Sequence, residues 1–250
     1  MKKTVLTMAV LAMTCIGALQ AQNSFSLRAG VALPTGNYAD ATADYTNNVL
    51  RYGLLDKTKK GGASTGFTVG AQGKFGIKSV KGLGITVSAD FFFNSTNADV
   101  RDYCDEDIDT RETSTFELSY KLPKYMHIPI MAGIDYTYDL NEHIGFYGEG
   151  ALGVNVRIIS KFEQYSATPT TETLNTATYK TAAAFAYRFG AGIVINKRYN
   201  LGIAYYGLGS SKVEGEISSE VNGQNSPSTT KLKGGTIAAN NFTVRLGITF

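Results

Sequence analysis

Apolar and polar side chains alternate with a period of two along most of this sequence, and this pattern restricts the fold most. In the last stretch, Phe242, Val244, Leu246, Ile248 and Phe250 share one face. Successive side chains point to opposite faces only in an extended strand, so the pattern predicts β-structure. Eight stretches show it: 25–33, 66–77, 83–93, 115–139, 144–158, 181–195, 199–208 and 240–250.

The connections between these stretches alternate between short and long. Turns of hairpin length span 78–82, 140–143 and 196–198, whereas the other connections span 34–65, 94–114, 160–180 and 209–240. Because antiparallel strands alternate in direction, the short turns fall at one end and the long connections at the other. This asymmetry predicts an all-β fold, a closed eight-stranded antiparallel up-and-down transmembrane β-barrel. The long loops would be extracellular, and both chain ends would lie at the periplasmic end.

The two faces of the predicted strands differ in charge. An eight-stranded barrel has an interior just wide enough for side chains, so mixed charges could fill it as a paired network without leaving a pore. Buried charges need partners, so the apolar face is expected to contact lipid. The predicted lumen charge network consists of Arg28, Lys74, Asp90, Glu117, His127, Asp135, Glu149, Arg157, Arg188 and Arg245.

Alternative architectures remain open at this stage. Two further strands, within Val49–Leu55 or the last long connection, would widen the barrel into a narrow pore for small solutes. A soluble periplasmic lipocalin-like barrel or β-sandwich would also show alternation. A helical membrane protein is excluded, because no stretch after the N-terminal segment has 18 consecutive apolar residues.

The N-terminal segment resembles a secretory signal peptide. Lys2 and Lys3 precede an apolar run that ends near Ala21, so we expect a cleaved signal at 1–21 and a barrel domain at 22–250. A lipoprotein signal ending at Cys15 fits less well, because Ala12-Met13-Thr14 lacks the expected pattern. Cleavage lowers the net charge of +3 by two, which gives no reason to expect a nucleic-acid partner.

Few residues suggest chemistry. Cys104 would be alone in the mature chain and could form no internal disulfide. His127 falls on the lumen face, where Asp90 or Asp135 could hold it, and no zinc-ligand set accompanies it. We therefore expect no enzyme activity, no catalytic residue and no cofactor.

The segment 99–112 is strongly acidic. Asp105, Asp107 and Asp109 alternate along it and form a weak Ca²⁺ candidate, because carboxylate oxygens are the ligands that Ca²⁺ prefers. The segment lacks the glycine and the distant glutamate of an EF-hand. A solvated acidic loop is the interpretation that we favour.

Two motifs resemble the PorT-like outer-membrane β-barrel proteins of Gram-negative Bacteroidetes. The stretch 25–36, FSLRAGVALPTG, resembles their first strand and turn, and 125–133, YMHIPIMAG, resembles their Tyr-x-x-Ile-Pro element. Phe250 resembles the assembly signal read by the barrel-assembly machinery. The resemblance implies an integral outer-membrane protein of the cell envelope, without a catalytic site, in contact with membrane lipids and lipopolysaccharide.

The resemblance is compatible with two alternative functions. The first is a structural and surface-interaction role carried by the extracellular loops. The second is that of an accessory component of a secretion or envelope complex, which would bind an envelope protein partner.

Overall fold

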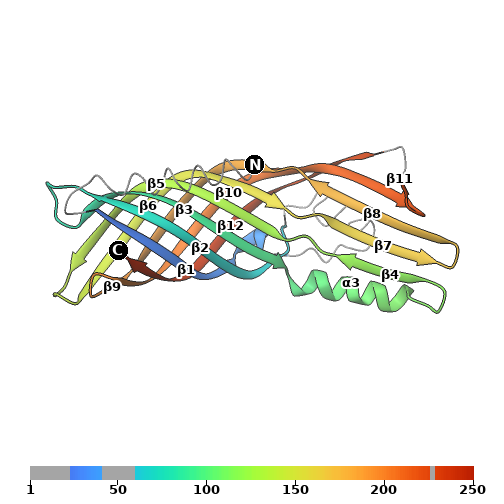
Figure 1. The fold of residues 1–250 in the computed structure, drawn as a ribbon, viewed down its shortest axis with the longest axis horizontal. Coiled ribbons are helices and arrows are strands. Elements are labelled where there is room, and N and C mark those ends of the chain that lie inside the picture. The colour runs from blue at the N-terminus through green and yellow to red at the C-terminus, as the bar shows by residue number, and fades with distance from the viewer. Residues whose placement is uncertain (1–22, 41–59, 226–228) are drawn as a thin grey trace.

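The computed structural model describes residues 23–40, 60–225 and 229–250. The predicted signal peptide at 1–21 and the segment Val49–Leu55 lie outside these residues. The described chain forms one antiparallel sheet, most of which closes into a barrel, together with a single α-helix (Figure 1).

Eight strands form the barrel. Their order around the ring is β1-β2-β3-β5-β6-β9-β10-β12, and the pairing of β12 with β1 closes it. All neighbours are antiparallel, so the predicted eight-stranded up-and-down barrel is confirmed. The strands are β1 (Asn23–Pro34), β2 (Ala63–Gly76), β3 (Leu83–Thr96), β5 (Tyr125–Asp139), β6 (Ile144–Ile159), β9 (Ala182–Ile195), β10 (Tyr199–Val221) and β12 (Thr230–Thr249).

The three short turns lie at one end of the ring, as predicted. The turn between β9 and β10 is tight, and Asn196 and Lys197 have φ angles of 52° and 56°. At the same end, Phe25 and Phe250 exchange two backbone hydrogen bonds of 3.1 and 2.8 Å. The start of β1 and the end of β12 therefore meet at the short-turn end of the barrel.

At the other end the sheet continues beyond the ring. The outer halves of β10 and β12 extend as a hairpin that ends at β11 (Gln224–Asn225), and β8, β7 and β4 add to β10 in that order. The added strands are β4 (Glu117–Lys121), β7 (Phe162–Thr168) and β8 (Thr171–Tyr179). These strands, the hairpin and helix α3 (Ala98–Arg111) form what we call the outer platform (Figure 1).

The predicted single strand over 115–139 is wrong. The chain leaves the ring at Leu122-Pro123-Lys124, and β4 pairs with β7 in the outer platform instead of continuing β5. Pro123 has no backbone N–H and so cannot donate to a ladder. The Thr96 hydroxyl donates to the Pro123 carbonyl oxygen at 2.6 Å and holds this break against the barrel.

All four predicted loops contain regular structure, and in 34–65 it includes the 3-10 helix Gly36–Tyr38. The connections 160–180 and 209–240 form strands, and 94–114 contains α3, whose N-terminus is capped by the Asn97 side chain. Many side chains of these strands are only partly buried, so the strands need no strict apolar alternation, and their Thr, Ser and Gly composition resembles that of loops. Helix α3, the single α-helix of the described residues, does not combine the length and apolar character that crossing a membrane requires.

Candidate functional site

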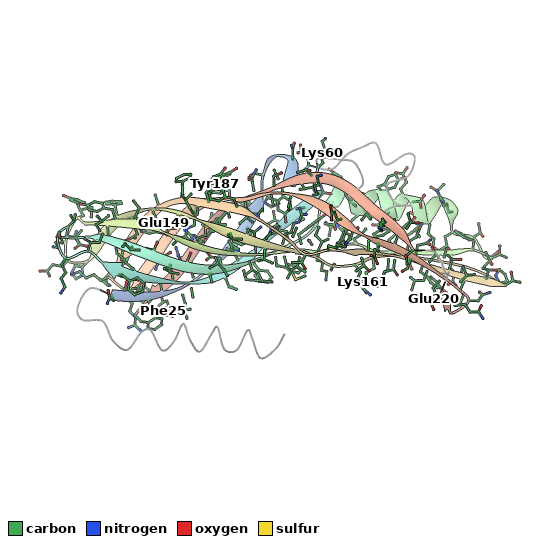
Figure 2. All side chains as sticks on the ribbon, turned by 90° about the horizontal axis from the view of Figure 1, so that it is seen from above. Phe25, Lys60, Glu149, Lys161, Tyr187 and Glu220 are labelled. Atoms are coloured by element: carbon green, nitrogen blue, oxygen red, sulfur yellow. The ribbon has the colours of Figure 1, made fainter. Side chains whose placement is uncertain are left out.

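The centre of the lumen is occupied by one carboxylate and three arginines. Glu149 on β6 accepts hydrogen bonds from Arg28 at 3.1 and 3.2 Å, from Arg188 at 3.1 Å and from Arg245 at 2.5 Å. The four side chains are at most 5% exposed. They come from β1, β6, β9 and β12, so this cluster joins strands from opposite sides of the ring. Figure 2 labels Glu149 within the barrel.

A second acidic group completes the cluster. Asp90 on β3 pairs with Arg188 at 3.2 Å and accepts a hydrogen bond from the Tyr206 hydroxyl at 3.3 Å. The Tyr206 hydroxyl in turn accepts from Arg245 at 2.7 Å. Arg188 also donates to Gln72 and Ser88, at 2.9 and 3.0 Å. This packing fills the cross-section of the barrel with charged and polar groups that are hydrogen-bonded to one another.

Towards the platform, a turn between β1 and β2 folds into the mouth of the barrel. Tyr38, in the short 3-10 helix Gly36–Tyr38, is 1% exposed, and its hydroxyl lies 3.1 Å from His127 Nε2. His127 Nδ1 lies 3.0 Å from the Asn155 amide nitrogen. The expected partners of His127, Asp90 and Asp135, are therefore wrong. Tyr38, His127 and Asn155 form a second layer that closes the lumen.

Towards the short turns, the lumen opens into a polar cavity. Lys74 forms an ion pair with Asp135 and donates to the Gly82 carbonyl and the Thr137 hydroxyl, at 3.1 and 3.0 Å. These residues line a cavity of about 370 Å³, together with Arg28, Tyr147 and Glu149 at its inner end. The cavity therefore ends blindly at the central cluster.

Nine of the ten residues predicted for the lumen network lie inside the barrel. Glu117 is the exception, because β4 leaves the ring and exposes its side chain on the outer platform. Arg157 is buried but bonds to the carbonyls of Ser211 and Lys212, at 3.3 and 2.9 Å, and not to a carboxylate. Sequence reasoning missed the neutral members Tyr38, Gln72, Asn155 and Tyr206. Of these, Gln72 and Asn155 lie in phase with charged lumen residues on their strands.

The outward face of the ring is a continuous apolar belt. On β6, exposed apolar side chains run from Ile144 to Val154, ten residues apart by number. At a rise of ~3.4 Å and a tilt of about 40°, they span about 26 Å along the barrel axis, close to the thickness of a transmembrane barrel's apolar band. Members on the other strands include Leu27, Val31, Phe67, Val69, Ile85, Val87, Ile130, Ile134, Phe185, Phe189, Leu201, Ile203, Val244 and Leu246.

Buried side chains pack between helix α3 and the sheet of the outer platform, and they continue the hydrophobic core of the barrel. Val100 and Cys104 of α3 are buried, as are Leu118 and Phe162, and the Phe162 ring stacks on Tyr120 at 6.2 Å. Burial and the nearby aspartates raise the pKa of the Cys104 thiol to about 12. The Tyr120 hydroxyl donates to Asp107 at 2.6 Å, which anchors α3 to β4.

The helix also determines where the three candidate Ca²⁺ ligands lie. Residues two apart on an α-helix point to different sides, so Asp105, Asp107 and Asp109 do not converge. Asp107 is already engaged by Tyr120 and by Arg111, whose Nε lies 2.8 Å away. In the part of the chain that the structure describes, no group of three or more His, Cys, Asp or Glu side chains could hold a metal ion.

Comparison with known proteins gives distant structural likenesses. No protein-family model and no curated protein matches the chain. Among solved structures, the attachment invasion locus protein Ail of Yersinia pestis, in complex with the heparin analogue sucrose octasulfate, is 13% identical with a TM-score of 0.39, over 92% of this chain and 100% of its own. OprG from Pseudomonas aeruginosa is 12% identical with a TM-score of 0.43, over 91% and 96%. Neisserial surface protein A is 10% identical with a TM-score of 0.41, over 92% and 96%.

Proposed function

We propose that this chain is an integral outer-membrane barrel that acts in surface interaction through its outer platform. The apolar belt is the observation that carries the proposal. At least six of its members are 50% or more exposed, among them Phe185 at 62% and Leu246 at 66%. In water, so large an apolar surface would favour aggregation, whereas in a bilayer it is stabilising.

The same geometry supports a structural role and opposes transport. A barrel that is filled by an arginine–carboxylate cluster and closed again by Tyr38 and His127 offers no continuous path. The last long connection, which could have contributed two further strands to a wider ring, instead extends β10 and β12 into the outer platform. Recognition therefore falls to the platform, the part of the described chain that projects furthest beyond the apolar belt.

The proposal includes a signal peptide, a PorT-like assignment and a second possible role. A cleaved signal peptide at 1–21 would provide export, and the two motifs described above support a PorT-like protein of Bacteroidetes that the barrel-assembly machinery inserts. The runner-up role, an accessory component of a secretion or envelope complex, is favoured by the polar cavity at the short-turn end, which a periplasmic partner could reach.

Expression in a Gram-negative host tests this proposal. We expect the protein in the outer-membrane fraction, with migration in SDS gels that changes on boiling, and we expect protease added to intact cells to cut only in the platform and its loops. A soluble periplasmic protein would contradict the location. Copurification of one stoichiometric envelope protein in mild detergent would favour the accessory role.

A further inference from the structure

The polar cavity at the short-turn end is large enough for a small ligand. Its volume of about 370 Å³ lies within the range of ligand pockets. Apart from Leu83 and Val194, the side chains that line it are polar, and Ser26, Thr137 and Thr249 contribute hydroxyl groups. The central cluster closes its inner end, so a ligand would enter from the short turns. Such a surface suits a hydrophilic ligand.

The central cluster beside this cavity carries more positive than negative charge. Its three arginines, Arg28, Arg188 and Arg245, share the two carboxylates of Glu149 and Asp90. Three positive and two negative charges leave one positive charge in excess, among side chains that are at most 5% exposed. A buried charge without a partner is costly, so a negative charge next to the cluster would be stabilising.

The inner end of the cavity also has donor groups that lack an acceptor. Of the three arginines, Arg28 is the one that lines the cavity. Its Nη1 donates to Glu149, whereas its Nε and Nη2, which lie beneath the cavity wall, have no hydrogen-bond partner in the described chain. Gln72 on the neighbouring strand β2 is 8% exposed, and its Oε1 accepts from Arg188. No described residue bonds to its Nε2, which can therefore donate into the cavity.

The carboxylates that border the cavity are already paired. The central one is shared by three arginines, and Asp135 forms an ion pair with Lys74. At the mouth, Asp139 lies 3.9 Å from Lys81. Lys197, exposed in the tight β9–β10 turn, also lines the cavity and forms no ion pair with a carboxylate of the residues that the structure describes. The mouth and the inner end therefore both favour an anion.

We propose that this cavity binds a small hydrophilic carboxylate. The carboxylate would lie at the inner end, beside the Arg28 guanidinium and within reach of the Gln72 amide, and the rest of the ligand would meet the hydroxyl groups of the wall. A carboxylate carries one negative charge, which matches the single excess positive charge of the cluster, and arginine is well suited to recognise it.

Two sources carry this group, a free hydroxy acid and the C-terminus of a short hydrophilic peptide. The proposal names the ligand chemistry of the cavity that the accessory role invokes. Access to the cavity from the periplasm rests on the proposed membrane location.

Isothermal titration calorimetry tests the site on full-length protein, purified in dodecyl maltoside at low salt. The probes are gluconate, the N-acetylated dipeptide Gly-Ser with a free C-terminus, and the same dipeptide with an amidated C-terminus. We expect a carboxylate probe to bind and the amidated dipeptide to bind at least about tenfold more weakly, because it lacks the negative charge. The tighter of the two carboxylate probes identifies the source.

Two variants remove the excess charge of the cluster. Gln72→Glu keeps the size of the side chain and the acceptor for Arg188, but it replaces the free donor and adds a negative charge. Arg28→Gln leaves two arginines with two carboxylates. We expect each variant to weaken the binding of the carboxylate probes at least about tenfold.

Lysines in the short turns provide a matched comparison. Lys197→Gln removes a charge at the mouth and should weaken binding about twofold to threefold. Lys78→Gln removes an exposed lysine of the β2–β3 turn that does not line the cavity, and it should bind like the wild type. Binding that is unchanged in Gln72→Glu and Arg28→Gln, or that inorganic phosphate matches, would overturn the carboxylate site.

Heat-dependent gel migration shows whether each variant is folded, and Gln72→Glu alone decides if Arg28→Gln fails this check. A wild type that migrates as a barrel but binds no probe overturns the site and leaves the barrel assignment standing. A wild type outside the membrane fraction contradicts the location, whereas calorimetry on the purified protein still decides the cavity.

Discussion

Glu149 is the residue on which the order of the lumen depends most, because three buried arginines share its carboxylate. Glu149→Gln removes the negative charge and leaves the arginines with Asp90 alone. We expect a loss of about 3 kcal/mol or more in the free energy of unfolding, measured by guanidinium titration in lipid vesicles. Glu163→Gln, which breaks the exposed pair with Lys121, should cost less than about 1 kcal/mol. Equal losses in the two variants would contradict the central role of Glu149.

Cys104 gives a prediction about reactivity and pH. The thiol is 2% exposed, and burial raises its pKa to about 12. The folded protein should therefore react slowly with a membrane-impermeant maleimide at pH 7, and denaturation should expose the thiol at once.

The raised pKa also links Cys104 to platform stability. A thiol whose folded pKa lies above its unfolded value stabilises the fold at low pH, and this contribution is lost as pH rises above ~8.5, the unfolded pKa. Melting of α3, followed by amide hydrogen exchange, should become easier between about pH 9 and 11. Cys104→Ala should lack this part of the pH dependence. Rapid labelling of native protein at pH 7 would contradict a buried thiol.

At the scale of elements, the platform and the barrel should unfold separately. Phe162 is 2% exposed and packs on Tyr120, so Phe162→Ala leaves a cavity beneath α3. We expect a loss of about 3 kcal/mol confined to the platform. Proteolysis within α3 should accelerate, while the heat-dependent gel shift of the barrel stays unchanged.

The exposed Thr168, at the tip of the β7–β8 hairpin, provides the control, and Thr168→Ala should change neither property. Loss of the gel shift in Phe162→Ala would show that the platform and the barrel fold as one unit.

The elements also show how far the sequence predicts this structure. The ring strands could be predicted because an apolar outward face and a charged lumen face force a strict alternation, as in β6 and β12. The platform strands could not, because most side chains of β7 and β8 are only partly buried on either face and need not alternate. Glu117 was misplaced because the alternation in the sequence continues through Pro123, although the chain passes there from the outer platform into the ring.

Within the site, charged residues were easier to predict than neutral ones. An arginine or a glutamate on the inward face needs a partner, which identifies Arg188, Arg245 and Glu149. The neutral side chains of Tyr38 and Asn155 need no oppositely charged partner, so the sequence does not single them out. Tyr38 also lies in the connection between β1 and β2, which folds inward through contacts with Gly61 and His127, two residues distant in sequence.

For the whole molecule, the filled lumen predicts that the barrel does not conduct. Purified protein in planar bilayers should give no channel steps, because Arg188, Arg245, Tyr206 and Phe92 occupy the middle of the ring and Tyr38 closes its mouth. Discrete conductance steps in the wild type, absent from a mock preparation, would contradict a sealed barrel.

Quenching of single tryptophans by brominated lipids tests the central claim, a closed barrel with a lipid-facing apolar belt, most directly. The natural chain contains no tryptophan, so each substitution introduces one reporter. In vesicles of lipid brominated along the acyl chains, we predict strong quenching for Leu152→Trp and Phe189→Trp, and little for Phe92→Trp in the lumen and Tyr165→Trp on the platform. Equal quenching at Phe92 and Leu152, or no quenching at Leu152 and Phe189, would contradict the account.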